Sequence, residues 1–521
     1  MLAMWRRSES RRCHDRRTRN GTRLGVEQLE GRLLLSGTNP DFGPEVWNDA
    51  TPSAFLNDSA EVGYVGRYGY AGINSTTSPS RTGPSLDAVD LSPDLPSGQR
   101  VGTKIKWTVA GSGSGSEVYR FSVARFGERP RMMYDFRADN VFEWTPIEDG
   151  QYLIIAHVRD LATNSLNASF SFFQVRPTLR AQLVPVVTPT DNPLIALYSA
   201  PDSSQKGDSM RVHFLAPGEG MITANVTSPK PTQSGHTMNF YIAGMRADTL
   251  YAIRHEILDT GGKHVEFGPW RTFTTGSLPF PFPPAQVVNP PTIGDALGQK
   301  VVLHSTIIGN VALGIPAFPY AMDLQAEVIW FLDQENSGLW RTVDGGTFLQ
   351  HDAGSLREVD LMGNVLRETN LDRINRQLTK MGQDVVNNIH HEARPLPNGH
   401  TAILAAVEKI LEDVQGPGPV DILGDMVVVL DENFQVVWTW NGFEHLDVTR
   451  AAVLGETCSS DAGGGCPPVL LADEANDWMH SNAITYDETD GNLLISMRHQ
   501  DWIIKIDYAD GLGNGDIVWR L

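Results

Sequence analysis

The chain has 521 residues, 41% of them hydrophobic, and a formal net charge of −20 at pH 7. This length predicts two to four domains. The acidic balance argues against nucleic acid and anionic membrane surfaces as partners, because both bind proteins through clustered positive charge. The 49 Gly and 32 Pro residues, with few helical patterns, predict a β-rich chain with many turns.

Residues 1–36 form a basic head with nine Arg and four acidic residues. Its final part, Val26–Ser36, resembles the head of some large exported bacterial surface proteins, which implies export; a basic disordered tail is the alternative. Residues 37–98 are rich in Ser, Thr, Pro and Gly and predict a linker. No apolar run reaches the length of about 18 residues that a membrane span needs, so we expect none.

Two β-rich segments follow the linker. Short apolar runs separated by turn residues predict an immunoglobulin-like sandwich over 99–177, and Gly150–Tyr152 resembles a tyrosine corner. A second set of runs over 190–275 predicts another sandwich, in which Met245–Tyr251 resembles fibronectin type III. A Pro-rich joint at 276–293 then predicts a stiff link to the last domain, because proline fixes φ.

The last region, 294–521, contains a degenerate repeat. In each copy an apolar run ends in Asp, a turn follows, and a second apolar run comes next; these aspartates are Asp323, Asp360, Asp431 and Asp507. The shortest interval between copies is close to one propeller blade of about 40–50 residues. The repeat therefore predicts a partial β-propeller and an all-β protein. Three second runs carry a tryptophan that we interpret as blade core: Trp330, Trp438 and Trp519.

A β-hairpin near the C-terminus carries the first candidate site. The runs Asn482–Tyr486 and Leu493–Ile495 flank a turn, with His480 just before the first and Arg498 after the second. The two side chains then lie near one rim, where an imidazole and a guanidinium suit an anionic ester or acid. The alternative is that His480 caps a strand and Arg498 pairs with a surface carboxylate.

A second candidate lies in Asn388–Glu392, which contains His390 and His391 before a Pro-Asn-Gly turn. Because a strand exposes alternate side chains, only one of the two histidines is expected to face a site. Taken alone, this segment is also consistent with a hydrogen-bonded loop.

The hairpin motif resembles the bacterial arylsulfotransferases. Its pattern is Asp-Trp-x-His-x-Asn from Asp477, followed by Ser-x-Arg-His-Gln from Ser496, and the likeness extends over 320–521 and more weakly over the preceding sandwich. The resemblance implies an exported, periplasmic or cell-surface enzyme with a six-bladed-type propeller. Such enzymes move a sulfuryl group from an aryl sulfate to a phenol without a nucleotide donor.

The resemblance also implies site residues and a mechanism. It selects His391, the histidine directly before the acid, and adds His480 and Arg498. Transfer would be ping-pong through a sulfo-histidine. Arg498 would stabilise charge on the sulfuryl oxygens, while His391 and His480 would donate hydrogen bonds. Neither a metal nor an organic cofactor is expected.

The chain departs from the family in one respect. The family's nucleophilic histidine lies in a Gln-His-Thr-like motif on a later blade, and no such motif follows Gln500. Residues 294–521 also suffice for about four blades. We therefore expect a C-terminally truncated chain with little or no transfer activity as written. The alternative is a non-catalytic, surface-exposed module that binds a glycan, peptide or aromatic ligand.

We interpret the remaining histidines and cysteines as structural residues without a role in catalysis. His499 is expected on the opposite strand face from Arg498, and His445 in a segment that connects blades. No partner is predicted for His304, His351 and His400. Cys458 and Cys466 bracket a short loop and are either a disulfide or two free thiols. A metal site at these cysteines is not expected, since no ligand-spaced partner lies nearby.

Overall fold

The structure is a computed structural model of the chain. It describes residues 89–521 except for 112–114, 179–183, 203–206, 217, 219–224, 234, 290–300, 305–317, 334–338, 344–345 and 460–465. The basic head and most of the expected linker lie outside the described residues. The described part is nearly all β, as predicted. None of its helices has the length and apolar character needed to cross a lipid bilayer.

The first sandwich consists of two sheets. One has the order β1 (Asp90–Pro93), β3 (Ile105–Ala110), β6 (Val141–Trp144); the other has the order β2 (Gln99–Arg100), β8 (Ser165–Arg176), β7 (Gly150–Asp160), β4 (Glu117–Arg125), β5 (Arg131–Arg137). The sheets pack through aromatic rings: Trp107 lies edge-on to Phe173, and Trp144 to Tyr152. Strand β1 begins upstream of residue 99, where the sequence analysis starts this domain.

The tyrosine corner is present. The hydroxyl of Tyr152 donates to the carbonyl oxygen of Glu148, four residues upstream, at 2.7 Å. A related contact occurs in the second sandwich, where the backbone N–H of Arg246 donates to the hydroxyl of Tyr251 at 2.9 Å. Each bond fixes the turn that leads into the strand of its tyrosine.

The second sandwich also has two sheets. The first has the order β14 (Met238–Ile242), β10 (Ala196–Ala200), β9 (Val186–Pro189); the second has the order β12 (Asn225–Val226), β11 (Ser209–Leu215), β15 (Leu250–Leu258), β16 (His264–Phe267), with β13 (Lys230–Pro231) on β11 and β17 (Arg271–Thr274) on β15. Its core contains fully buried Tyr198, Met210 and Ile253.

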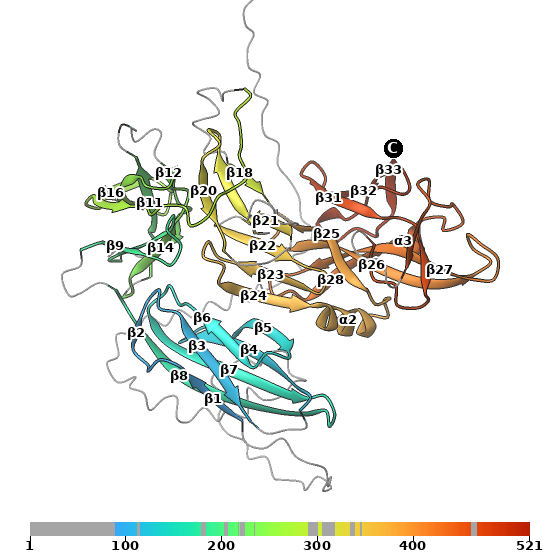
Figure 1. Cartoon of the computed structure of the whole chain (residues 1–521), viewed down its shortest axis with the longest axis horizontal. Coiled ribbons are helices and arrows are strands. Elements are labelled where there is room, and N and C mark those ends of the chain that lie inside the picture. The colour runs from blue at the N-terminus through green and yellow to red at the C-terminus, as the bar shows by residue number, and fades with distance from the viewer. Residues whose placement is uncertain are drawn as a thin grey trace, which may run out of the picture. The chain divides into compact units, whose positions relative to one another are not determined.

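Four antiparallel sheets make up the last region, coloured yellow to red in Figure 1. They are β18 (Val301–His304), β19 (Tyr320–Asp323), β20 (Val328–Phe331); β21 (Leu339–Val343), β22 (Thr347–His351), β23 (Ser355–Val359), β24 (Val365–Asn370); β25 (Asn388–Pro395), β26 (Thr401–Glu412), β27 (Pro419–Leu430), β28 (Val436–Asn441); and β31 (Ser481–Asp487), β32 (Asn492–Met497), β33 (Trp502–Ile506), β34 (Ile517–Arg520). Each follows chain order, as propeller blades do.

The third of these sheets carries additions. Strand β30 (Glu474–Asp477) pairs in parallel with β27, and β29 (Glu456–Ser459) pairs with β30. Helix α2 (Leu371–Lys380) connects β24 to β25, and the one-turn helix α3 (Gly442–His445) follows β28. The described sheets form a curled, open half-barrel. A closed propeller therefore stays a prediction.

The repeated aspartates have a clear structural role. In three of them one carboxylate oxygen accepts the backbone N–H groups two and four residues ahead: Asp323 from Gln325 and Glu327, Asp360 from Met362 and Asn364, Asp431 from Asn433 and Gln435. Asp507 accepts from Asn514 in a longer loop. Each closes the turn between the last two strands of its sheet, because an Asp side chain can satisfy turn amides.

The tryptophan interpretation is only partly right. Trp330 is buried, and its indole N–H donates to the carbonyl oxygen of Leu361. Trp438 is partly buried, but Trp519 is 41% exposed. The core assignment of Trp519 is wrong, since β34 is the outermost strand of the described sheet and pairs on one side with β33.

Replacing Tyr152 by Phe tests the tyrosine corner. The change leaves the Glu148 carbonyl without its partner and should lower the stability of the first sandwich by about 1–3 kcal/mol. Hydrogen exchange in β7 measures this, and we expect faster exchange there than in Tyr119→Phe, a matched change on neighbouring β4. Equal exchange in the two variants would show that the bond contributes nothing.

Candidate active site

The predicted C-terminal hairpin is confirmed. Strand β31 pairs antiparallel with β32, and the turn between them runs from Asp487 to Asn492. His480 directly precedes β31 and Arg498 directly follows β32; the backbone N–H of Arg498 donates to the carbonyl oxygen of His480 at 3.1 Å. The two residues therefore lie at one end of the hairpin, as expected.

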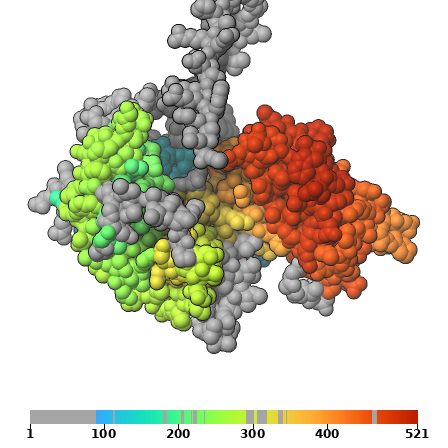
Figure 2. Space-filling model, turned by 90° about the horizontal axis from the view of Figure 1, so that it is seen from above, coloured from blue at the N-terminus to red at the C-terminus, as the bar shows by residue number. Residues whose placement is uncertain are grey.

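A β-bulge brings His391 to the same place. The register of β25 against β26 shifts between His390 and Ala393, so His391 and Glu392 form the extra residues. The Nε2 atom of His391 lies 3.1 Å from Nε2 of His480. Strand β25 thus faces β31 of the next sheet, and Figure 2 shows their two sheets, orange and red, as one continuous body.

Both histidines have an unusual backbone. The φ angle is 53° at His391 and 48° at His480, in the left-handed region that non-glycine residues rarely adopt. Such strain costs about 1–3 kcal/mol per residue and concentrates at functional sites. At His391 the bulge supplies the reason, since it turns the side chain away from the alternation of the strand.

Because of this bulge, the expectation that only one of the paired histidines faces the site is wrong. The ring of His390 lies 5.2 Å from that of His391, and its Nε2 lies 3.1 Å from Oδ1 of Asp425. Glu392 points elsewhere and receives two hydrogen bonds from the guanidinium of Arg341, both of 2.8 Å.

Asp477 orients His480. Its Oδ2 atom lies 2.5 Å from Nδ1 of His480, and both side chains are buried. The hydrogen bond to Asp477 raises the pKa of His480, since a carboxylate favours the protonated ring. Burial, with His390 and His480 nearby, lowers the pKa of His391 to about 4. The pair therefore consists of a neutral His391 and a His480 that retains protons more readily.

Asp425 ties the two sheets together. Its Oδ2 accepts the backbone N–H of Ser481 at 2.6 Å, directly after His480, while its Oδ1 faces His390. Burial opposes the charged form, but His390 and Ser481 outweigh it and lower the pKa of Asp425. Sequence reasoning missed this residue, although an acid directly before the apolar run Met426–Leu430 was a signal.

Arg498 lies beside the histidine pair. Its side chain is 47% exposed, and its nearest carboxylate oxygen belongs to Glu456 at 3.4 Å. The positive charge of Arg498 opposes protonation of both His391 and His480. The alternative predicted from sequence, an ion pair with a surface carboxylate, is thus also realised.

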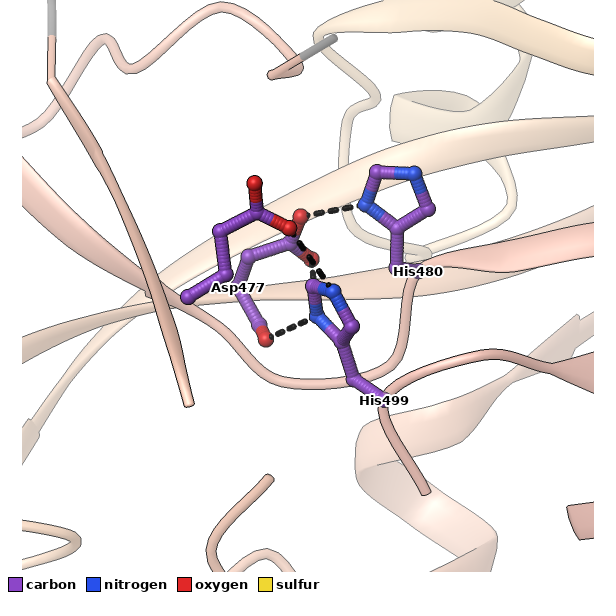
Figure 3. A group of neighbouring side chains, drawn as sticks. Asp477, His480 and His499 are labelled. Carbon is purple, nitrogen blue, oxygen red and sulfur yellow. Dashed lines mark hydrogen bonds and ion pairs between the residues drawn. The ribbon is translucent and has the colours of Figure 1, made fainter. Parts of the chain in front are cut away.

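The structural interpretation of His499 is wrong about its position. The chain has left β32 at Arg498, so strand alternation no longer applies. The His499 ring is fully buried, with its centroid 4.7 Å from that of His480. Figure 3 shows both rings turned toward Asp477. His499 therefore belongs to the same cluster of side chains.

His351 is a further neighbour that sequence reasoning did not place. It ends β22, is buried, and has no hydrogen bond at either ring nitrogen among the described residues. Burial, with the charges of His390 and His391, lowers its pKa to about 4. His445 lies apart and stacks on Trp440 with a centroid distance of 5.4 Å.

Cys458 and Cys466 form a disulfide, which resolves the alternatives left open by the sequence. Cys458 is fully buried in β29, the strand that also carries Glu456. The bridge therefore anchors one side of the site. A cavity of about 830 Å³ lies elsewhere, lined by Trp144, Tyr241 and Trp330, and none of the three predicted site residues lines it.

Comparison with known proteins identifies relatives of this region. The family model described as Arylsulfotransferase (ASST) matches residues 296–521. Arylsulfate sulfotransferase AssT of Escherichia coli O6:H1 is 27% identical and covers 38% of this chain and 36% of its own; the Lelliottia amnigena enzyme of the same name is 26% identical with the same coverage. The chain thus spans about a third of the length of these curated relatives.

Solved structures match the chain only loosely. A two-domain fibronectin type III segment of chicken tenascin is 12% identical, covers 37% of this chain and all of its own, and has a TM-score of 0.16. A marsupial T cell receptor is 17% identical, with corresponding coverages of 38% and 100% and a TM-score of 0.17. These scores are too low to support an inference about fold. The family model and the curated relatives agree with the motif around His480 and Arg498, and residues 296–521 resemble the arylsulfotransferase family.

Proposed function

We propose that His391, His480 and Arg498 bind the sulfuryl group of an aryl sulfate and take part in its transfer to a phenol. The observation that carries this proposal is the 3.1 Å approach of the two Nε2 atoms from separate sheets, beside a half-exposed guanidinium. It is supported by the family of residues 296–521 and by relatives named arylsulfate sulfotransferases.

Charge complementarity supports the role of Arg498. An aryl sulfate is a monoanion whose charge is spread over three oxygens, and a guanidinium recognises such a group through paired N–H donors. The Glu456 partner of Arg498 is 40% exposed, so their ion pair is weak and replaceable. An arriving sulfate can therefore take the place of Glu456.

The histidines supply hydrogen-bond donors. Nδ1 of His480 donates to Asp477, which leaves Nε2 directed at His391. One of the two facing Nε2 atoms must donate and the other must accept. A sulfuryl or phenolic oxygen placed near them would receive the donated hydrogen bond in place of the neighbouring ring.

The proposed reaction has two halves. In the first, an imidazole nitrogen bonds to sulfur while the bond from sulfur to the aryl oxygen breaks, and the departing phenolate takes a proton from a neighbouring donor. In the second, the oxygen of the acceptor phenol bonds to sulfur, its proton passes to a base, and the nitrogen–sulfur bond breaks. Arg498 and the two histidines stabilise the sulfuryl oxygens in both transition states.

Export is part of the same proposal. The Cys458–Cys466 disulfide supports it, because such bonds persist in oxidising compartments. In this setting the substrates would be extracellular or periplasmic phenols and their sulfate esters.

Arg498→Ala tests substrate binding. Loss of a charge-assisted contact costs about 1.5–3 kcal/mol, so the affinity for 4-nitrophenyl sulfate should fall by about 10- to 100-fold. Isothermal titration calorimetry with the purified chain measures this. Arg520→Ala, an exposed arginine on β34, is the matched control and should bind as the unaltered chain does. Equal affinity in both variants would contradict the assignment of Arg498.

Release of 4-nitrophenolate in the presence of excess phenol tests transfer. Whatever release occurs should need both histidines, because both are proposed to contact the sulfuryl group. We expect His391→Ala or His480→Ala to lower the rate by about 10²–10³-fold, as for loss of one oxyanion donor. His445→Ala should leave it unchanged.

Binding of 4-nitrophenyl sulfate without release of 4-nitrophenolate would instead favour the non-catalytic binding module. Release that survives both substitutions would contradict the proposed site.

A further inference from the structure

His499 presents a buried nitrogen without a hydrogen bond. Its Nδ1 lies 2.7 Å from the backbone carbonyl oxygen of Asp477, and a carbonyl only accepts, so Nδ1 carries the hydrogen. In the neutral ring Nε2 is then a bare acceptor. The side chain is fully buried, and Nε2 has no hydrogen-bond partner in the part of the chain that the structure describes.

This nitrogen faces a carboxylate. Oε2 of Glu456 lies 2.9 Å from Nε2 of His499, although the geometry is not that of a hydrogen bond. Two atoms that both offer lone pairs repel each other at this distance unless a positive charge lies between or beside them. Arg498 reaches the same Glu456 oxygen only at 3.4 Å and from an exposed position. The contact indicates a place for a cation.

Two further groups converge on the same place. Nδ1 of His480 and the carboxylate of Asp477 complete a set of four potential ligand atoms, all within 4.8 Å of one another. Figure 3 shows the rings of His480 and His499 one above the other, both joined to Asp477. Of the four residues, only Glu456 is exposed. We propose that Glu456, Asp477, His480 and His499 form a site for one divalent transition-metal ion of the Zn²⁺ class.

The donor set favours this class of ion. Two imidazole nitrogens and two carboxylate oxygens match the four-coordinate sites of Zn²⁺, whereas Ca²⁺ and Mg²⁺ prefer six or more oxygens. Two carboxylates balance the charge of a divalent ion, which suits a mostly buried site. The hydrogen bond from Nδ1 of His499 to a backbone carbonyl is the usual outer support of a metal-binding histidine.

Metal binding would change the neighbouring site in two ways. An ion bound at Nδ1 of His480 would take the place of the hydrogen there, so the neutral ring would carry its one hydrogen on Nε2 and would donate from that atom. It would also occupy Glu456 and free Arg498 for an anionic ligand. These consequences rest on the proposed function, whereas metal binding itself does not.

Zinc titration of the full chain after dialysis against a chelator tests the proposal. We expect one Zn²⁺ per chain with a dissociation constant at or below the micromolar range, and no displacement by Ca²⁺. Glu456→Gln should weaken binding at least tenfold, as should His499→Ala. Glu474→Gln is the matched control, because Glu474 is an exposed acid on neighbouring β30 outside the cluster.

The two variants differ in how readily they should fold, which keeps a failure of folding distinct from a failure of zinc binding. Glu456 is at the surface, so Glu456→Gln should fold even if the buried His499→Ala variant does not, and circular dichroism checks both. Absence of stoichiometric zinc binding would assign the His499–Glu456 contact to a protonated ring and overturn the proposal. Binding that is unchanged in Glu456→Gln would overturn it as well. Aryl sulfate affinity is measured separately, so failure of either proposal leaves the other standing.

Discussion

The carboxylate of Asp477 is the group on which the candidate site depends. It belongs to β30, which pairs in parallel with β27 at Ile422 and Leu423, so its position is set by the third sheet of the last region. Its Oδ2 receives Nδ1 of His480, the residue that leads into the fourth sheet. A single buried hydrogen bond therefore couples the orientation of the candidate imidazole to the packing between two sheets.

The backbone around this bond is strained, and the surroundings offset the strain. His391 and His480 both adopt left-handed conformations, at a cost of about 1–3 kcal/mol each. Asp425 compensates by accepting the N–H of Ser481 and by facing His390. The two strained residues meet through their Nε2 atoms. Both of these residues thus lie where two sheets present side chains to one place, as expected for a pre-organised site.

Local patterns predicted much of the fold and the hairpin. The repeated aspartates marked true turns because a single Asp side chain can close a turn by itself, and the spacing around His480 and Arg498 defined two adjacent strands with a short connection. Both features depend on contacts between residues close in sequence. The tyrosine corner at Tyr152 was recognisable for the same reason.

Contacts between residues that are distant in sequence explain why some residues of the site were not predicted. Asp425 and His351 reach the site through packing between sheets, which no local pattern reports. His499 was placed on the wrong face because alternation was extended beyond the end of β32, and the pairing of the two histidines at 390 and 391 was misread because a bulge interrupts β25. The parallel pairing of β30 with β27 has no sequence signal of its own, yet it positions Asp477.

The most direct test of the central claim is a titration of the full chain with 4-nitrophenyl sulfate, followed by ¹⁵N nuclear magnetic resonance of the histidine side chains. If the sulfuryl group binds between the two sheets, the Nε2 signals of His391 and His480 will shift together, with one midpoint in ligand concentration. The signals of His445, which stacks on Trp440, will not move. Signals of His391 and His480 that stay unchanged at saturating ligand would contradict the account.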